Sequence, residues 1–356
     1  MKIAFVLGTR PEIIKLAPII TKLKKSKNSL IFTGQHYDYN MGLQFIEQLG
    51  LSKPDYTMKL SRRIPSIQIS EIILKLSKIL SEDKPDTVIV QGDTNTVLAA
   101  SISSIKNNIP VSHVESGLRS FDWRMPEEHN RVMVDHISEI LFAPTLISKN
   151  NLVSEKVHGS IHVTGNTVID AVNTYSKISQ KKSDLDISIN NFILTTLHRS
   201  ENVDDEKTLS SIIKGLLMSN TNVIFPLHPR TKKRLKEFHL YEKLKNSNNV
   251  LLLDAVGYFE MLELMKKCSF IFTDSGGLQE ESTARAIQKK VIVARKTTDR
   301  PESIKSKTSE LVKLDAESIS KIIQNTNKNP IFKSNQKPFG DGNASSRIIK
   351  ILQQKF

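Results

Sequence analysis

The segment IAFVLGTRPE, residues 3–12, shows how the chain begins to fold. Five apolar residues in succession, Ile3–Leu7, predict a strand that is buried on both faces, as in a parallel sheet. Gly8 permits a tight turn, and Thr9 and Glu12 have the spacing of a capping box at the start of a helix. A strand that passes through a glycine turn into a helix is one β–α unit of an α/β fold.

The same alternation continues along both halves of the chain. Short apolar runs predict strands, and longer segments with helical spacing separate them. The predicted strands are 3–7, 29–33, 87–91, 111–115, 140–143 and 161–164 in the first half, and 192–196, 222–226, 250–253, 270–273, 291–294 and 311–312 in the second. The predicted class is therefore α/β, with parallel sheets covered by helices on both faces.

Two polar stretches divide the chain. A Lys-, Ser-, Asp- and Asn-rich stretch at 173–190 predicts a hinge, because 356 residues exceed what one hydrophobic core usually supports. A second polar stretch, 325–343, precedes an amphipathic helix at 345–354. We expect three parts: a lobe of residues 1–168, a lobe of residues 169–340 and a C-terminal helix in residues 341–356.

Composition excludes several classes of protein. No apolar run approaches the length of about 18 residues that a membrane span needs, and the N-terminal run is too short for a signal peptide, so we expect no membrane insertion and a cytoplasmic location. The single cysteine, Cys268, excludes an intramolecular disulfide. The net charge of +14 suggests an anionic partner, but the lysines are scattered without interleaved aromatic residues, so dispersed surface lysine explains the charge better than nucleic-acid binding does. Such a field would also attract a phosphorylated small substrate.

Acidic residues follow the predicted strands of the first half. Asp93 follows the third strand, Glu115 ends the fourth, and Glu127 lies in the first turn of the next predicted helix. Taken singly, Asp93 can be a helix cap, and Glu127 can pair with Arg131 four residues later. Because the carboxyl ends of parallel strands share one edge, we expect the carboxylates to gather there, where proximity would separate their pKa values into an acid and a base.

Basic residues and glycines mark candidate anion sites. Arg10 and Lys15 lie near a predicted helix N-terminus, where an anion is favoured, although a capped helix with two solvated cations explains them equally well. The segment Ser275–Gly277 lets backbone amides approach a pyrophosphate, although a plain tight turn also fits. Glu281, one turn later, can accept hydrogen bonds from ribose hydroxyls.

The second half carries two histidines at equivalent strand exits, His198 and His228, which favours contacts with a polar ligand. Arg300 adds a cation to the same rim. No H-E-x-x-H motif or Cys/His spacing is present, so we expect no metal, and no G-x-S-x-G or nicotinamide-binding glycine motif is present, so we expect no cofactor.

Together these motifs resemble the UDP-N-acetylglucosamine 2-epimerase family, of the non-hydrolysing type. They occur in the family's order across nearly the whole chain, and jointly they are highly specific. The matching segments are GTRPEIIK (8–15), QGDTNT (91–96), HVESGLRSFD (113–122), MPEEHNR (125–131), GNTVIDA (165–171), LHRSEN (197–202), HPR (228–230), DSGGLQEE (274–281) and TTDRPE (297–302).

The resemblance implies a GT-B-like fold with two Rossmann-like lobes, a cleft between them and a C-terminal helix that crosses back onto the first lobe. It implies reversible epimerisation at C2 of UDP-N-acetylglucosamine to UDP-N-acetylmannosamine, by anti elimination of UDP through 2-acetamidoglucal and re-addition. It also implies that the carboxylates lie in the first lobe, that UDP binds to the second, and that the protein is a homodimer.

The resemblance also assigns roles to residues. Asp93, Glu115 and Glu127 match the family's catalytic carboxylates, whose division of labour stays open, and His198 matches its essential histidine. The positions that match contacts to UDP or the sugar are Arg10, Lys15, Ser275, Gly276, Gly277, Glu281 and Arg300, with Arg131 and His228 as further contributors and Val256 and Met261 against the uracil.

Some alternatives stay open at this point. The segment 35–40 differs from bacterial members in which a second UDP-N-acetylglucosamine is an allosteric activator. Related activities are 2-epimerisation of a UDP-2-acetamido-2,6-dideoxyhexose and the hydrolysing branch that releases N-acetylmannosamine. A GT-B glycosyltransferase is a further alternative, whereas a non-catalytic nucleotide-sugar sensor gains nothing from buried carboxylates.

Overall fold

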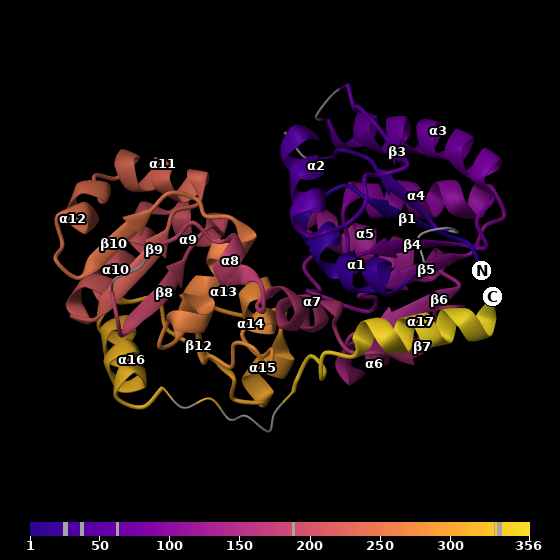
Figure 1. Ribbon diagram of the computed structural model, residues 1–356. Helices are drawn as coiled ribbons and strands as arrows, with labels where there is room; N and C mark the ends of the chain where they lie inside the picture. Colours follow the sequence, from indigo (N-terminus) through magenta and orange to yellow (C-terminus); the bar gives the residue numbers. More distant parts are fainter. Residues whose placement is uncertain (24–27, 36–38, 62–63, 187–188, 331, 333–336) are drawn as a thin grey trace. The chain divides into compact units, whose positions relative to one another are not determined.

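The computed structural model describes residues 1–23, 28–35, 39–61, 64–186, 189–330, 332 and 337–356. The chain divides into two compact units, and Figure 1 shows both. The first consists of Met1–Ala171 and Phe339–Phe356, and the second of Val172–Pro338. The change from one to the other falls inside helix α7 (Thr167–Tyr175).

The first unit is built on a seven-stranded parallel sheet in the order β3-β2-β1-β4-β5-β6-β7. From β1 the next strands in sequence, β2 and β3, are added on one side, and from β4 the next strands are added on the other side. The direction of winding therefore reverses between β1 and β4. In such sheets ligands bind beyond the carboxyl ends of the strands at this reversal. The strands are β1 (Ile3–Leu7), β2 (Ser29–Phe32), β3 (Tyr56–Thr57), β4 (Thr87–Gln91), β5 (Val111–Val114), β6 (Ile140–Ala143) and β7 (Ser160–Val163).

Helices bury the apolar side chains of this sheet. Every residue of β1 and of β4 is buried, as predicted for central parallel strands. Val88 and Val90 of β4 share a core cluster with Leu76 of α3 and Val97 of α4. The helices of the unit are α1 (Arg10–Lys22), α2 (Tyr39–Gln48), α3 (Pro65–Asp83), α4 (Asn95–Lys106), α5 (Pro126–Ile137), α6 (Leu146–Ser154) and α17 (Ala344–Lys355).

The C-terminal helix α17 belongs to the first unit, where it packs on α1. Asp170 of α7 holds its N-terminus by accepting hydrogen bonds from the backbone amides of Ala344 (3.1 Å) and Ser345 (2.9 Å). Lys22 of α1 donates to the Ser345 hydroxyl at 2.7 Å. A carboxylate at a helix N-terminus satisfies amides that have no partner within the helix.

The second unit repeats the architecture with a six-stranded parallel sheet in the order β10-β9-β8-β11-β12-β13. Its winding reverses between β8 and β11. The strands are β8 (Phe192–Thr196), β9 (Asn222–Pro226), β10 (Val250–Leu253), β11 (Ile271–Thr273), β12 (Val291–Val293) and β13 (Ser309–Leu311). The helices are α8 (Ser179–Lys182), α9 (Ser200–Val203), α10 (Glu206–Met218), α11 (Pro229–Glu237), α12 (Tyr241–Lys245), α13 (Tyr258–Lys267), α14 (Gly276–Glu281), α15 (Pro301–Lys305) and α16 (Ala316–Lys328).

The predicted fold class is confirmed: the chain is α/β, with two Rossmann-like sheets and a C-terminal helix. The predicted strands lie within two residues of the observed ones at each end, and the short strand β3 is the one that the sequence pattern does not indicate. Among the described residues, no helix combines the length and apolar character that crossing a bilayer requires.

Candidate active site

Glu115 stands directly after β5 in an unusual backbone conformation. Its φ angle is +70°, in the left-handed region that residues with a side chain seldom adopt. The backbone amides of Glu115 and Ser116 both donate to the carbonyl oxygen of Phe142, at 3.1 and 3.2 Å, and Gly117 follows with φ +77°. Strained backbone of this kind concentrates at functional sites, because the surrounding structure must hold it in place.

The carboxylate of Glu115 lies in a polar cluster at the carboxyl edge of the sheet. Its side chain is 8% exposed. Lys15 of α1 pairs with its Oε2 at 2.5 Å, and the amide of Gln91, the last residue of β4, donates to the same oxygen at 2.6 Å. Lys15, which the sequence predicts as a contact to UDP or sugar, is thus placed beside a predicted catalytic carboxylate. A cation at this distance favours the ionised carboxylate.

Asp93 follows the neighbouring strand β4 and is held by Arg131 of α5. The Arg131 Nε and Nη2 atoms each lie 2.7 Å from Asp93 Oδ2, and Nη1 lies 2.9 Å from Glu128 Oε2. Asn130 donates to the Asp93 carbonyl oxygen at 2.8 Å. The sequence suggests Glu127, four residues earlier, as a partner of Arg131, whereas the structure pairs Arg131 with Glu128, three residues earlier.

The two consecutive glutamates of α5 differ in their surroundings. Glu127 is exposed, and no hydrogen bond or ion pair holds its carboxylate among the described residues. Glu128 is 1% exposed and accepts the backbone amides of Ser120 and Phe121. Burial raises the pKa of Glu128. The hydrogen bonds from Ser120, Phe121 and Arg131 lower it by more, so the pKa lies below its ordinary value. Glu128 is therefore ionised and holds the backbone of the loop before α5 by hydrogen bonds.

Glu12 links the turn after β1 to the turn after β4. It is buried and accepts the backbone amide of Thr9, as the predicted capping box requires. It also accepts the backbone amide of Gly8 and the Thr94 hydroxyl, the latter at 2.5 Å. Burial raises the pKa of Glu12 to about 7 against the lowering effect of these donors. The neighbouring Arg10 is exposed, with its guanidinium 4.6 Å from the centre of the Phe45 ring.

In the second unit, the winding reversal between β8 and β11 holds His198 and Asp274. Asp274 is fully buried and accepts the backbone amides of His198 (3.1 Å) and Arg199 (3.0 Å), and the side chain of Asn202 at 3.0 Å. His198 Nδ1 lies 3.2 Å from Asp274 Oδ1, and the His198 ring centre lies 5.9 Å from that of His228. The sequence motif 274–281 includes Asp274, but the sequence alone does not predict that Asp274 orients the His198 ring.

Burial lowers the pKa of His198, and the charges of Arg199 and Arg230 and the neighbouring His228 lower it further, while Asp274 opposes them. Burial likewise lowers the pKa of His228, assisted by Arg230. Both imidazoles are therefore neutral at pH 7. A neutral imidazole can accept a proton or donate a hydrogen bond.

The start of α14 gathers the predicted pyrophosphate residues. The Ser275 hydroxyl caps the helix by accepting the Leu278 amide at 3.4 Å. A Cβ atom added to Gly276 would lie 3.6 Å from Arg300 Cζ, and one added to Gly277 would lie 3.9 Å from Glu281 Oε1. The segment Ser275–Gly277, Glu281 and Arg300 are thus neighbours.

Arg300 is a buried ion-pair residue. Its Nε atom contacts Glu280, its Nη1 lies 2.9 Å from Asp299 Oδ2, and Arg295 pairs with the same Asp299 at 2.8 Å. Burial raises the pKa of Asp299, but Arg300 and Arg295 outweigh it and hold the pKa well below its usual range. The network fixes the Arg300 guanidinium beside α14.

The predicted uracil contacts follow β10. Val256 lies in the loop after that strand and Met261 in α13, and both are half-buried. In the segment 35–40, which bears on allosteric activation, residues 36–38 lie outside the described residues. In the part of the chain that the structure describes, no three His, Cys, Asp or Glu side chains gather as metal ligands would.

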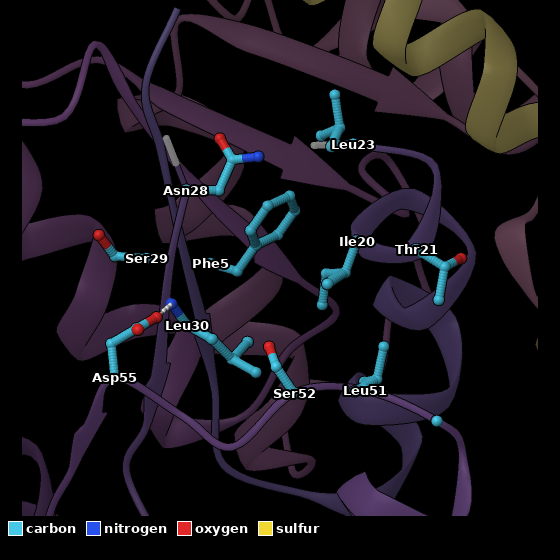
Figure 2. Close-up of a pocket in the computed structure, with 11 residues that line it drawn as sticks. Phe5, Ile20, Thr21, Leu23, Asn28, Ser29, Leu30, Leu51, Ser52 and Asp55 are labelled. Atoms are coloured by element: carbon cyan, nitrogen blue, oxygen red, sulfur yellow. Dashed lines mark hydrogen bonds between the residues drawn. The ribbon is translucent and has the colours of Figure 1, made fainter. Parts of the chain in front are cut away.

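A pocket of about 550 Å³ lies away from these residues, at the amino ends of β1 and β2 (Figure 2). Its lining includes apolar Phe5, Ile20 and Leu51. Among the described residues that line it, Asp55 is the one that carries a charge, and it accepts the Leu30 amide at 2.8 Å. The opposite edge of the sheet carries Glu115, so this pocket does not belong to the candidate active site.

Comparison with known proteins identifies the family. A family model described as UDP-N-acetylglucosamine 2-epimerase matches residues 20–353. A UDP-N-acetylglucosamine 2-epimerase of Methanocaldococcus jannaschii is 43% identical over 366 residues, which cover 99% of both chains. A UDP-2,3-diacetamido-2,3-dideoxy-D-glucuronate 2-epimerase of Pseudomonas aeruginosa is 34% identical over 362 residues, again 99% of both.

A solved structure agrees with this. The crystal structure of Methanocaldococcus jannaschii UDP-GlcNAc 2-epimerase in complex with UDP-GlcNAc and UDP matches with a TM-score of 0.86 and 42% identity, covering 99% of this chain and 100% of that one. The resemblance inferred from the sequence motifs is therefore confirmed. Since the family model matches nearly the whole chain and the relatives match it at full length, the chain belongs to the UDP-N-acetylglucosamine 2-epimerase family and is an isomerase.

Proposed function

We propose that the chain interconverts UDP-N-acetylglucosamine and UDP-N-acetylmannosamine by inverting C2 of the sugar. Two carboxylates at adjacent strand ends, Asp93 held by Arg131 and Glu115 held by Lys15, carry the proposal. The relative of 43% identity and the matching structure with bound UDP-GlcNAc support this choice of substrate.

The reaction needs acid–base groups on both faces of C2. A base removes the C2 proton while the C1–oxygen bond breaks, and the bonding electrons leave with UDP, which yields 2-acetamidoglucal. A proton then returns to the opposite face of C2 and a UDP phosphate oxygen attacks C1, so no atom or electron is gained or lost. We assign these proton transfers to Asp93, Glu115 and Glu127, since a positioned carboxylate can accept a proton as a base and return it as an acid.

The second unit is proposed to bind UDP. Negative charge develops on the β-phosphate as the C1–oxygen bond breaks, and donors placed to receive that charge lower the barrier. Ser275 and the amides of Gly276 and Gly277 are proposed as those donors, with Arg300 and neutral His198 beside them. Further proposed contacts are Arg10, Lys15, Arg131 and His228 to the phosphates or sugar, Glu281 to the ribose, and Val256 and Met261 to the uracil.

A second substrate has support from one observation. The Pseudomonas aeruginosa relative acts on a UDP-linked diacetamido uronate and is 34% identical over the full length. The proton transfers at C2 would be the same, and only the groups at C3 and C6 of the sugar differ. The homodimer is proposed from the family resemblance, and a mass of twice the 40.1 kDa chain by light scattering tests it.

Product analysis tests the proposal. The purified protein is incubated separately with UDP-N-acetylglucosamine and with the diacetamido uronate, and the products are identified by proton NMR. UDP-N-acetylmannosamine as the product supports the proposal. Free N-acetylmannosamine with UDP would indicate the hydrolysing activity. Conversion of the uronate alone would identify the uronate as the substrate in place of UDP-N-acetylglucosamine, and an unchanged sugar in both tubes would refute the proposal.

Two neighbouring glutamates supply a matched control for the assignment. Glu127→Gln should lower turnover at least about 100-fold, because it removes a proton-transfer group, and should leave stability unchanged because Glu127 is exposed. Glu128→Gln should lower stability by about 1–3 kcal/mol, because the ionised Glu128 holds buried donors. Wild-type turnover in Glu127→Gln would remove Glu127 from the mechanism.

A further inference from the structure

One buried histidine contacts two turns of the first unit at once. His113 of β5 is 1% exposed. Its Nε2 lies 2.8 Å from the carbonyl oxygen of Gly92, the residue before Asp93, and its Nδ1 lies 2.7 Å from Asp135 Oδ1. The other Asp135 oxygen accepts the backbone amide of Gly117 at 3.0 Å, two residues after Glu115. A continuous chain of hydrogen bonds therefore joins the Asp93 turn to the Glu115 turn.

Both ring nitrogens of His113 face oxygen atoms of other residues. At Nε2 the partner is a backbone carbonyl, which only accepts hydrogen bonds, so Nε2 is the donor. Asp135 faces two other donors, the Gly117 amide and the Arg119 guanidinium, whose Nη1 is 2.8 Å from Oδ2, so Asp135 is ionised and Nδ1 must donate to it. Burial raises the pKa of Asp135, but the contacts with His113 and Arg119 lower it by more, so the pKa lies below its ordinary value, as expected of an ionised carboxylate.

The turns that this chain joins need support. Gly92 and Gly117 have φ angles of +81° and +77°. Glu115, two residues before Gly117, has a φ angle of +70°. The Gly117 carbonyl oxygen also accepts the side chain of Asn151 at 3.0 Å. Without such contacts, the left-handed conformation of Glu115 would be lost to more favourable backbone angles.

The same helix face that supplies Asp135 also contacts the other parts of the site. Glu128, Arg131 and Asp135 are spaced by three and four residues, which places them on one face of α5. Glu128 holds the backbone of the loop before α5, Arg131 holds the Asp93 carboxylate, and Asp135 holds the Glu115 turn. Helix α5 is thus bonded to the Asp93 turn, to the Glu115 turn and to the loop that precedes it.

We propose that His113 and Asp135 are positioning residues of the reaction, which fix the separation of the Asp93 and Glu115 turns without touching the substrate. The assignment rests on the proposed function. Its physical basis is that proton transfer requires the carboxylates at hydrogen-bonding distance from C2, and a displacement of about 1 Å can lower a rate about 100-fold.

Two amide variants separate the two contacts of His113. His113→Asn places a donor where Nδ1 lies and keeps the contact with Asp135, but loses Gly92. His113→Gln places a donor where Nε2 lies and keeps the contact with Gly92, but loses Asp135. Ser112→Ala is the matched control, since Ser112 is the preceding residue of β5, is fully buried and bonds the Thr87 hydroxyl at 2.9 Å, away from both turns.

The first measurement is steady-state kinetics with UDP affinity by calorimetry. Both His113 variants should lower kcat about 10- to 100-fold with the dissociation constant of UDP unchanged, and Ser112→Ala should lower stability with kcat unchanged. Wild-type kcat in folded His113→Asn and His113→Gln would overturn the proposal and leave His113 a purely structural residue.

The second measurement needs no substrate. Amide hydrogen exchange should rise in His113→Asn at residues 92–94 only, and in His113→Gln at residues 115–118 only, relative to Ser112→Ala. Exchange that rises equally across the unit, or at neither turn, would overturn the proposal. If the wild-type protein epimerises no UDP-sugar but the two turns respond separately, the proposed function fails while the coupling of the turns stands.

Discussion

Glu12→Gln is the substitution whose consequence the structure determines most closely. Gln keeps the shape of the side chain. Its oxygen can accept the Gly8 and Thr9 amides that Glu12 accepts now, and its amide can donate to the Thr94 hydroxyl. The variant therefore removes the ionisation of Glu12 and keeps its hydrogen bonds.

The magnitude follows from the two pKa values of Glu12. Burial raises the pKa from 4.5 to about 7 in the folded protein. A folded-state pKa above the unfolded one means that stability is fully present below pH 4.5 and is lost as the pH rises through 7. A difference of about 2.5 corresponds to about 3 kcal/mol, so between pH 5 and pH 8 the wild type should lose about 2 kcal/mol relative to Glu12→Gln.

Urea unfolding followed by far-UV circular dichroism at pH 5, 6, 7 and 8 measures this, as the difference between variant and wild type at each pH. Glu263→Gln is the control. Burial raises the pKa of Glu263, but Lys266, at 2.7 Å, and Ser179 lower it by more, so the pKa lies below its ordinary value. The difference of this control from wild type should be constant across this range. A constant difference for Glu12→Gln as well would refute the account of Glu12.

Three further substitutions have definite expected outcomes. Gly117→Ala should abolish turnover and lower stability by more than about 2 kcal/mol in urea unfolding, because its Cβ would lie 2.3 Å from the Ser148 carbonyl oxygen at φ +77°. Asp170→Ala should destabilise the protein by about 1–3 kcal/mol and raise hydrogen exchange at the start of α17, because two amides there lose their acceptor. Asp274→Asn should lower kcat at least about 10-fold and lower the pKa of His198 further in an NMR titration, because it removes the one charge that raises this pKa against burial and the neighbouring cations; an unchanged kcat would contradict the orienting role.

The sequence predicts the fold well because the strands are buried on both faces. A parallel strand such as β1 appears as an uninterrupted apolar run, and both of its ends lie where the sequence pattern predicts them. Strand β3 could not be found in this way, because it has only two residues, of which Tyr56 is half-buried and Thr57 is exposed. Its existence depends on pairing with β2, a contact that no local pattern contains.

The sequence predicts the location of the carboxylates better than their partners. Asp93 and Glu115 were expected at one sheet edge because both follow parallel strands. The pairing of Glu115 with Lys15 spans 100 residues and depends on where α1 lies over the sheet. Helical spacing alone allows Arg131 to pair with either preceding glutamate, and burial of Glu128 decides between them.

Solvent deuterium incorporation at C2 tests the central claim most directly. The protein is incubated with UDP-N-acetylglucosamine in deuterated water, and the C2 proton signal is followed by NMR. The proposed elimination and re-addition predict that UDP-N-acetylmannosamine forms with deuterium at C2, and that Asp93→Asn and Glu115→Gln abolish the exchange while they still bind UDP. Epimerised product that retains its C2 proton would contradict the account.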